Sequence, residues 1–384
     1  MRLDFRIFKY YPFGGLERNF LRITEECVKR GHEVTVRTAV WEGEIPAFLD
    51  SPGCGVVVVP ATGISNHAFR ASYVRNLPST LDGRSDLVVG FKQMPGLDLY
   101  YAGDVCFAAE ARRRSFAAVR GLMARNRLFR LYERSIFSPN SSTVILELSR
   151  VQRDAYIAEY GTPAERFTPI PPGIDKERIR SALPSRDESR KRFRVDSDET
   201  MLLMVGSDFK RKGVSRAIRA LGSISGGRAC SVKLFVVGKG SSASLTSLAR
   251  GLGVADQVFF PGPSDDVPSY LSAADALLHP ALSENTGNAI VEGLVAGLPV
   301  LATSNCGYAF HVERANAGKV VDGLSFSQTA FDAALSSLLS EMPGKKKEWK
   351  SNALDYSDAT DLYARPQIVA DTIERLVEGK LRAG

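Results

Sequence analysis

The sequence predicts an α/β protein built from two doubly wound domains with a cleft between them. Short apolar segments alternate with helical ones, and several are apolar on both faces, which is typical of parallel strands covered by helices on both sides. The alternation is interrupted by the proline- and glycine-rich segment Pro169–Asp175, which indicates a hinge. We therefore expect domains at 1–170 and 171–365, with a last helix at 366–381 that packs back on the first domain.

The first domain begins with a predicted strand at Leu3–Phe8. A helix is predicted over Leu16–Arg30, ending at Gly31, because glycine favours the left-handed turn that follows a helix. Further strands of this domain are predicted at Glu33–Thr38, Cys54–Pro60 and Leu87–Gly90.

The second domain begins after the polar stretch Arg186–Thr200. Its strands are predicted at Met201–Val205, Val232–Val237, Gln257–Phe260, Ala276–His279 and Pro299–Thr303. Its helices are predicted at Val214–Ile224, Ala243–Leu252, Val267–Ala274, Asn288–Ala296 and Tyr308–Asn316. Ligands of such sheets bind beyond the carboxyl ends of the strands, so a site is expected in the loops that follow them.

The composition is that of an ordinary soluble protein. The 384 residues are 44% hydrophobic and 24% charged, which excludes collagen-like, disulfide-rich and wholly disordered chains. The five cysteines form no C-x-x-C pair, so a zinc or iron–sulfur site is not indicated and reduced thiols are expected. The charged N-terminus excludes a signal-peptide core, and no long apolar run occurs, so we expect a cytoplasmic protein.

The net charge is concentrated in one segment. Residues 107–136 contribute +6 of the formal net charge of +7, through eight arginines against two acids. Two sets of side chains recur every seven residues: the basic Arg113, Arg120, Arg127 and Arg134, and the apolar Leu122, Phe129 and Ile136. On a helix these sets lie about 200° apart, which favours an interfacial helix on an anionic membrane surface. The alternative is a domain helix with a solvated basic face, and no nucleic-acid-binding module accompanies the arginines.

Two loops at predicted strand ends are suited to an anionic ligand. Tyr10–Gly15 has adjacent glycines that permit close backbone approach to an anion at a helix start, although a tight structural turn is the alternative. Gly206–Gly213 places Lys210, Arg211 and Lys212 after a strand, where two of them can donate charge-assisted hydrogen bonds to a diphosphate. The alternative there is a solvated basic loop. Neither loop has the G-x-G-x-x-G or Walker pattern.

A third loop runs from Glu284 to Glu292, with the sequence ENTGNAIVE. Glu284 is expected at the mouth of a helix, and Glu292 one to two turns inside it, among apolar residues where a carboxylate needs a partner. Between them, Thr286, Gly287 and Asn288 are expected to present amides at the helix N-terminus, an arrangement that favours phosphate. The alternative is that Glu292 forms a salt bridge to the other domain.

Two further features are not interpreted as sites. Asp196-Ser197-Asp198 has the D-x-D spacing of a metal motif but lies in a polar linker. The four histidines have no metal-ligand spacing, and His279, at a strand end, is interpreted as a core or supporting residue rather than a base. We therefore expect no metal and no cofactor.

Longer segments of the chain resemble the retaining GT-B glycosyltransferases, and among them the lipopolysaccharide core glucosyltransferase I family of Gram-negative bacteria. The E-x7-E motif at 284–292 is typical of the broad superfamily, whereas YPFGGLER and KQMPGLD are more specific. The segments that carry the resemblance are residues 9–23, 30–34, 41–46, 88–106, 171–174, 205–214, 277–301 and 305–309.

The resemblance implies that the second domain binds a nucleotide sugar, expected to be UDP-glucose. Arg211 and Lys212 are expected to hold the diphosphate, and Glu292 the ribose hydroxyls. Glu284 and the amides of Thr286–Asn288 are expected to contact the transferred sugar and the phosphates.

In the first domain, the resemblance implies that Gly15 backs the site and that Asp104 orients the acceptor or the sugar. The family carries Asp where this chain has Asn19. If that acid binds the acceptor or takes its proton, Asn19 cannot accept a proton, which leaves the acceptor and the sugar open. The loop at 261–267 also departs from the family sequence.

We therefore predict a retaining, metal-independent transferase that moves a hexose, expected to be glucose, from UDP to a heptose of the lipopolysaccharide core. The resemblance places it on the inner face of the inner membrane, and its favoured mechanism is same-face attack in which the leaving diphosphate takes the acceptor proton. The enzyme alternatives use another donor, such as UDP-GalNAc or UDP-galactose, or another acceptor. The non-enzyme alternative is a peripheral membrane or nucleic-acid-binding module on an inactive transferase fold.

Overall fold

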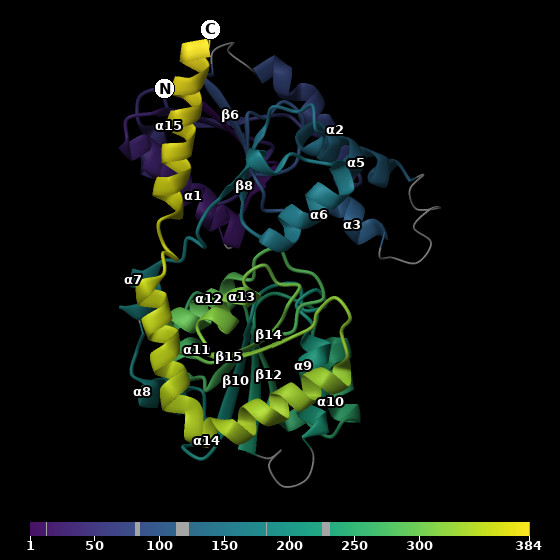
Figure 1. The fold of residues 1–384 in the computed structure, drawn as a ribbon, viewed down its shortest axis with the longest axis vertical. Coiled ribbons are helices and arrows are strands. Elements are labelled where there is room, and N and C mark those ends of the chain that lie inside the picture. The colour runs from purple at the N-terminus through teal and green to yellow at the C-terminus, as the bar shows by residue number, and fades with distance from the viewer. Residues whose placement is uncertain (13, 81–84, 113–122, 182, 225–230, 384) are drawn as a thin grey trace. The chain divides into compact units, whose positions relative to one another are not determined.

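The computed structural model describes the chain except residues 13, 81–84, 113–122, 182, 225–230 and 384, as two compact units (Figure 1). Unit 1 comprises Met1–Gly173 with Ala364–Gly384, and unit 2 comprises Ile174–Tyr363. Each unit is a parallel sheet with helices on both faces, so the prediction of doubly wound α/β units is confirmed.

The sheet of unit 1 has the strand order β5-β3-β1-β6-β7-β8-β9, with every described pair parallel. Its strands are β1 (Arg2–Arg6), β3 (Glu33–Thr38), β5 (Gly55–Val58), β6 (Leu87–Gly90), β7 (Leu99–Tyr101), β8 (Val144–Glu147) and β9 (Phe167–Pro169). A separate two-stranded sheet pairs β2 (Lys9–Tyr10) with β4 (Val40–Trp41). The direction of strand addition reverses between β1 and β6, the point at which ligands of such sheets bind.

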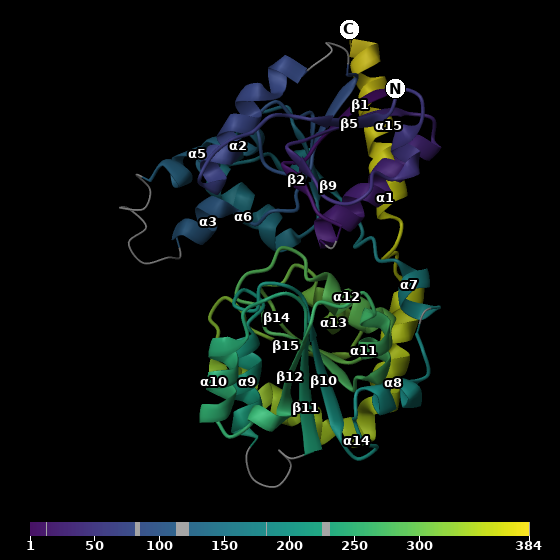
Figure 2. The same cartoon turned by 180° about the vertical axis from the view of Figure 1, so that it is seen from behind.

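The helices of unit 1 cover both faces of its sheet (Figures 1 and 2). The first and last helices, α1 and α15, pack together on one side, whereas α2, α5 and α6 lie on the other. The helices are α1 (Gly15–Lys29), α2 (Asn66–Asn76), α3 (Phe107–Arg112), α5 (Ala124–Phe137), α6 (Arg150–Tyr160) and α15 (Arg365–Ala383), with 3₁₀ turns at Ala47–Asp50, Leu77–Thr80 and Ala164–Arg166. Four side chains of α15 complete the core of unit 1: Val369, Ala370, Ile373 and Val377.

The chain passes between the units twice, after Gly173 and before Ala364. Arg365 is fully buried beside both points within unit 1. Its Nε donates to the carbonyl oxygen of Pro171 at 2.7 Å, and its Nη1 donates to the hydroxyl of Tyr101 at 2.6 Å. The first turn of α15 is therefore tied to the segment at which the chain leaves unit 1.

The sheet of unit 2 has the order β12-β11-β10-β13-β14-β15, again with every described pair parallel. Its strands are β10 (Thr200–Val205), β11 (Val232–Val237), β12 (Val258–Gly262), β13 (Ala276–His279), β14 (Val300–Thr303) and β15 (Gly318–Val321). The point of reversal lies between β10 and β13.

Two apolar cores lie on the two faces of this sheet, because successive side chains of a strand point to opposite faces. In β10, Leu202 and Met204 join the core under α9, α10 and α14, whereas Met201 and Leu203 join the core under α11 and α12. The helices of unit 2 are α7 (Lys176–Arg180), α8 (Arg186–Arg192), α9 (Val214–Ser223), α10 (Ala243–Gly251), α11 (Val267–Ala273), α12 (Asn288–Val295), α13 (Ala309–Arg314) and α14 (Gln328–Ala359), with a 3₁₀ turn at Ala255–Gln257.

Candidate functional site

Two loops meet in unit 2 at the carboxyl ends of β10 and β13, where the strand order reverses. The amide of Leu282 donates to the carbonyl oxygen of Arg211 at 2.8 Å, which joins the loop after β13 to the loop after β10. Gly213 has a φ of +73°, and a Cβ on it would lie 1.9 Å from the carbonyl oxygen of Pro280. Only glycine fits this contact, so the sequence of the first loop permits its close packing on the second.

The carboxylate of Glu284 joins the two basic side chains of this site. Its Oε2 accepts from Nη1 of Arg211 at 2.8 Å and from Nζ of Lys212 at 2.5 Å, and the residue is only 8% exposed. Burial alone would raise the pKa of Glu284, but the charges of Lys212 and Arg211 hold this pKa well below its usual range. Glu284 is therefore ionised at neutral pH and offsets one of the two positive charges assigned to the diphosphate.

The imidazole of His279 lies beneath this cluster at the end of β13. The residue is 2% exposed, and its Nε2 lies 3.7 Å from Oε2 of Glu284, without a hydrogen-bond partner among the described residues. Burial, and then the charge of Lys212, lower the pKa of His279, so the ring is neutral at pH 7. It packs 3.4 Å from the position a Cβ would take on Gly287, which fits the supporting role expected from the sequence.

The start of α12 contributes the remaining predicted residues. Gly287 precedes the helix with a φ of +90° and supplies no side-chain cap, while Thr286 before it is half-buried. The Oδ1 atom of Asn288 is buried and has no hydrogen-bond partner in the described part of the chain. The first amides of α12 thus follow directly after the loop that carries Glu284.

Glu292 lies one turn further along α12. The expectation that its carboxylate needs a partner is wrong, because the residue is half-buried rather than buried and keeps access to water. It makes no ion pair within unit 2 among the residues that the structure describes.

The C-terminal end of the loop at 261–267 is fixed by hydrogen bonds of Asp266. The carboxylate of Asp266 accepts from the amide of Ser269, which caps α11, and it also pairs with Arg192. The carboxylate of Asp266 therefore serves to cap α11 and to bind Arg192.

In unit 1, Asp104 lies just after β7 and is bound by two side chains that the sequence analysis did not single out. Its Oδ1 accepts from Nζ of Lys92 at 2.7 Å, and its Oδ2 accepts from the hydroxyl of Tyr100 at 3.2 Å. Burial would raise the pKa of Asp104, but Lys92 outweighs it and lowers this pKa. Lys92 follows β6, the strand at the reversal point, so its place in the KQMPGLD segment was the available signal.

The start of α1 places Gly15 and Asn19 beside another carboxylate, Glu17. The Nδ2 of Asn19 donates to the carbonyl oxygen of Gly15 at 3.0 Å, so this buried side chain binds its own helix. The carboxylate of Glu17 folds back over Gly14, and burial raises its pKa. Lys92 and Asp104 both act electrostatically on Glu17. The start of α1 and the loops after β6 and β7 therefore form one charged cluster.

The predicted membrane helix is only partly described. Arg113, Arg120 and Leu122 lie outside the described residues, whereas α5 carries Arg127 and Arg134, both exposed. The expectation that Phe129 faces a membrane is wrong. Its side chain is 8% exposed and packs edge-on against Phe107, with ring centroids 5.2 Å apart.

The apolar stripe of α5 therefore faces unit 1, because Phe129 and Ile136 are both buried there. This is the arrangement of a domain helix with a solvated basic face. Within the described residues, no helix is long and apolar enough to cross a membrane. The same residues contain no group of three or more His, Cys, Asp or Glu side chains that could hold a metal ion.

Comparisons with known proteins agree with this architecture. Residues 14–173 match the family described as glycosyl transferase 4-like domain, and residues 185–355 match glycosyl transferases group 1. The chain is similar to the lipopolysaccharide glucosyltransferase WaaG of Escherichia coli K12, with 38% identity over 99% of this chain and 100% of the relative.

Comparison with solved structures shows the same similarity to glycosyltransferases. A crystal structure of WaaG, a glycosyltransferase involved in lipopolysaccharide biosynthesis, has a TM-score of 0.89 and 39% identity, covering 97% of this chain and 99% of that one. HepE of Anabaena, solved with UDP-glucose, has a TM-score of 0.73 over 98% of this chain and 100% of that one, and at 20% identity it shows the fold alone. The chain therefore belongs to the GT-B glycosyltransferase family of the lipopolysaccharide glucosyltransferase WaaG.

Proposed function

We propose that this enzyme transfers glucose from UDP-glucose to a heptose of the lipopolysaccharide core, with retention of the anomeric configuration. Its relative WaaG is named a lipopolysaccharide glucosyltransferase, and HepE has been solved with UDP-glucose. The observation that carries the proposal is the pairing of the buried Glu284 with Arg211 and Lys212, where the strand order of unit 2 reverses.

The donor diphosphate is proposed to bind Arg211, Lys212 and the first amides of α12, at Thr286–Asn288. Arg211 is suited to this because its side chain is 41% exposed and has donors beyond the one used by Glu284. The two cations and Glu284 together carry one net positive charge, and the helix N-terminus adds roughly half a charge. Glu292, one turn further along α12, is proposed to bind the ribose hydroxyls.

In the proposed reaction, the bond between the sugar C1 and the diphosphate oxygen breaks, and a bond from C1 to the acceptor oxygen forms on the same face. The acceptor proton passes to the departing diphosphate oxygen, so no protein base is consumed. Positive charge develops on the sugar ring, and the ionised Glu284 stabilises it, while Arg211 and Lys212 stabilise the negative charge on the leaving group. No metal ion or cofactor takes part.

The acceptor is proposed to bind unit 1 at Asn19, and Asp104 to orient the acceptor or the sugar, while Gly15 keeps the donor-binding role that the resemblance implies. The exposed Arg127 and Arg134 of α5 are proposed to hold the enzyme to an anionic membrane surface, on the inner face of the inner membrane. Phe129 has no part in this contact, since its ring is buried.

The test is transfer by the purified enzyme from a panel of nucleotide sugars to lipopolysaccharide that ends in heptose. Mass spectrometry measures the added hexose, and NMR of the product determines the anomeric configuration. UDP-glucose is expected to be the preferred donor, with chelators leaving the rate unchanged. Faster transfer from UDP-galactose or UDP-GalNAc, inversion of configuration, or no transfer to heptose would each contradict the proposal.

Glu284→Gln tests the site itself, and Glu341→Gln is its matched control. The carboxylate of Glu341 also pairs with two cations, Lys319 at 2.7 Å and Lys345 at 3.0 Å, but it lies on α14. We expect the rate to fall by about 10²–10³-fold in Glu284→Gln and to be unchanged in Glu341→Gln. Full turnover by Glu284→Gln would remove this cluster from the mechanism.

A further inference from the structure

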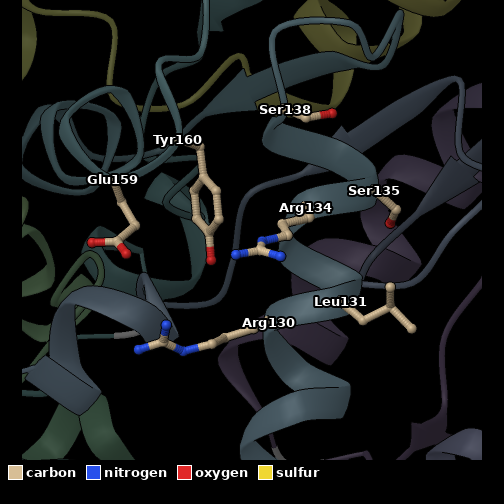
Figure 3. Close-up of a pocket in the computed structure, with 7 residues that line it drawn as sticks. All are labelled: Arg130, Leu131, Arg134, Ser135, Ser138, Glu159 and Tyr160. Atoms are coloured by element: carbon tan, nitrogen blue, oxygen red, sulfur yellow. The ribbon is translucent and has the colours of Figure 1, made fainter. Parts of the chain in front are cut away.

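A pocket lies in unit 1 between α5 and α6, on structure that the proposed reaction does not use (Figure 3). Its volume is about 590 Å³, within the range of small-molecule sites. The side chains that line it are Arg130, Leu131, Arg134, Ser135, Ser138, Glu159 and Tyr160. The side chains of Arg130 and Arg134 both extend from α5 toward the side of the pocket where Glu159 and Tyr160 lie, and Arg134 ends beside the ring of Tyr160, so two cations line one space.

Among the described residues, both arginines have donors without a partner. Nε of Arg130 is buried and has no hydrogen-bond partner, and the side chain of Arg134 makes no hydrogen bond or ion pair within the described parts of the chain. A buried guanidinium donor that is left unpaired costs free energy, and an anion in the pocket would remove that cost.

The other charged groups around the pocket are already paired. Glu159 pairs with Arg112 of α3. The hydroxyl of Tyr160 donates to Oε2 of the buried Glu133 at 2.6 Å, and Glu133 also accepts from the amide of Phe107 at 2.6 Å. Burial, and then the charge of Glu133, raise the pKa of Tyr160, so this hydroxyl stays protonated. The two arginines are thus the groups at the pocket that are left to bind a ligand.

We propose that this pocket binds a phosphate group through Arg130 and Arg134. Two guanidinium groups present parallel donors that match the oxygens of a phosphate, which is why arginine recurs in phosphate sites. The volume exceeds that of a phosphate alone, which leaves room for part of the molecule that carries it. That molecule is either a free phosphate ester or a lipid headgroup, and the two share the same contacts.

The experiment measures arginine accessibility one residue at a time, so that phosphate bound in unit 2 does not interfere. The full-length enzyme is labelled with phenylglyoxal at increasing concentrations of inorganic phosphate, and mass spectrometry of peptides follows each arginine. Arg127, exposed on the same helix but outside the pocket, is the internal control. At ten times the dissociation constant, labelling of Arg130 and Arg134 is expected to fall about tenfold, and that of Arg127 to be unchanged.

Substitutions on α5 test whether each arginine contributes to phosphate binding. In Arg130→Gln, protection of Arg134 is expected to need about tenfold more phosphate, because one charge-assisted contact is lost. Arg127→Gln removes the same charge from the same helix and is expected to leave protection unchanged. Thermal melts establish that both variants are folded.

Vesicles separate the two sources of phosphate. Protection of Arg130 and Arg134 by inorganic phosphate supports a site for free phosphate esters. Protection by phosphatidylglycerol vesicles, but by neither inorganic phosphate nor phosphatidylcholine vesicles, supports a headgroup site. The proposal is overturned if none of these ligands protects the two arginines, or if inorganic phosphate protects Arg127 to the same extent as Arg130 and Arg134.

Discussion

Replacing Glu284 by Gln should destabilise unit 2 by an amount that depends on pH. The substitution keeps the size of the side chain and an acceptor oxygen but removes its charge. Lys212 loses the most, because its side chain is 13% exposed and its Nζ lies 2.5 Å from the carboxylate. Arg211 is 41% exposed, so water replaces much of what it loses.

The size of this loss of stability follows from the contacts of Lys212 and Arg211. A hydrogen bond to a charged group contributes about 1.5–3 kcal/mol, and breaking a fully buried ion pair costs about 3–5 kcal/mol. Because Gln keeps an acceptor and Arg211 remains hydrated, we expect a loss of about 2–3 kcal/mol at pH 7. In a unit of this size that lowers the melting temperature by about 5–10 °C.

The pH dependence of stability gives a second measure of what the ionised Glu284 contributes. The folded pKa of Glu284 is lowered, so its stabilisation is fully present above the unfolded value of 4.5 and is lost as the pH falls toward the folded pKa. Between pH 7 and pH 3 the stability difference between wild type and variant should therefore shrink by about 2 kcal/mol.

Urea unfolding of wild type, Glu284→Gln and Glu341→Gln at pH 7, 5 and 3 measures both quantities. Glu341→Gln is expected to behave as wild type near neutral pH, since the pair it removes is at the surface. An equal stability of Glu284→Gln and wild type at pH 7, or a difference that stays constant down to pH 3, would refute the reasoning.

Three further outcomes are expected. Asp104→Asn should lower the rate of transfer at least about 100-fold without unfolding the protein, and an unchanged rate measured with the heptose acceptor would contradict its role. Gly213→Ala should lower the free energy of unfolding by more than about 2 kcal/mol, since its Cβ would meet a backbone oxygen at 1.9 Å, whereas Gly251→Ala in open space on α10 should stabilise by roughly 0.5 kcal/mol. Tyr160→Phe should lower the free energy of unfolding, measured in urea, by about 1–3 kcal/mol, because the buried Glu133 loses a hydrogen bond. An unchanged free energy of unfolding would show that water replaces the hydroxyl.

Elements with a strong apolar pattern were predictable from the sequence to within a few residues. Strand β11 has the predicted bounds, Val232–Val237, and α12 differs from the predicted helix by one residue at its end. The prediction did not extend to β7, β8, β9 and β15, although strands of similar length, such as β6 and β13, were predicted. The long helix α14 was also missed, because Pro343 and a polar run interrupt its pattern.

The site was predictable as a set of residues but not as an arrangement. The sequence places Arg211 and Lys212 in one loop and Glu284 in another. Their ion pairs depend on β10 lying next to β13, which is a property of strand order. The fold thus determines that a carboxylate offsets one of the two cations before any diphosphate binds.

Phe129 shows the limit of periodicity. A seven-residue repeat identifies two faces of a helix but does not say which face meets protein and which meets solvent. In α5 the face that carries Phe129 meets Phe107 and the rest of unit 1, whereas Arg127 and Arg134 are exposed, together with Leu131.

The position of α15 has a consequence for synthesis of the chain. Unit 2 is a continuous stretch of sequence, so all of it has been made by the time Tyr363 is added. Unit 1 is made first but lacks Val369, Ala370, Ile373 and Val377 of its core, and the anchor Arg365, until the last residues are translated. Its apolar surface under α15 thus stays exposed throughout the making of unit 2, which leaves the nascent chain open to aggregation and to chaperones during that interval. A ribosome that stops short of α15 would release a complete unit 2 attached to an incomplete unit 1.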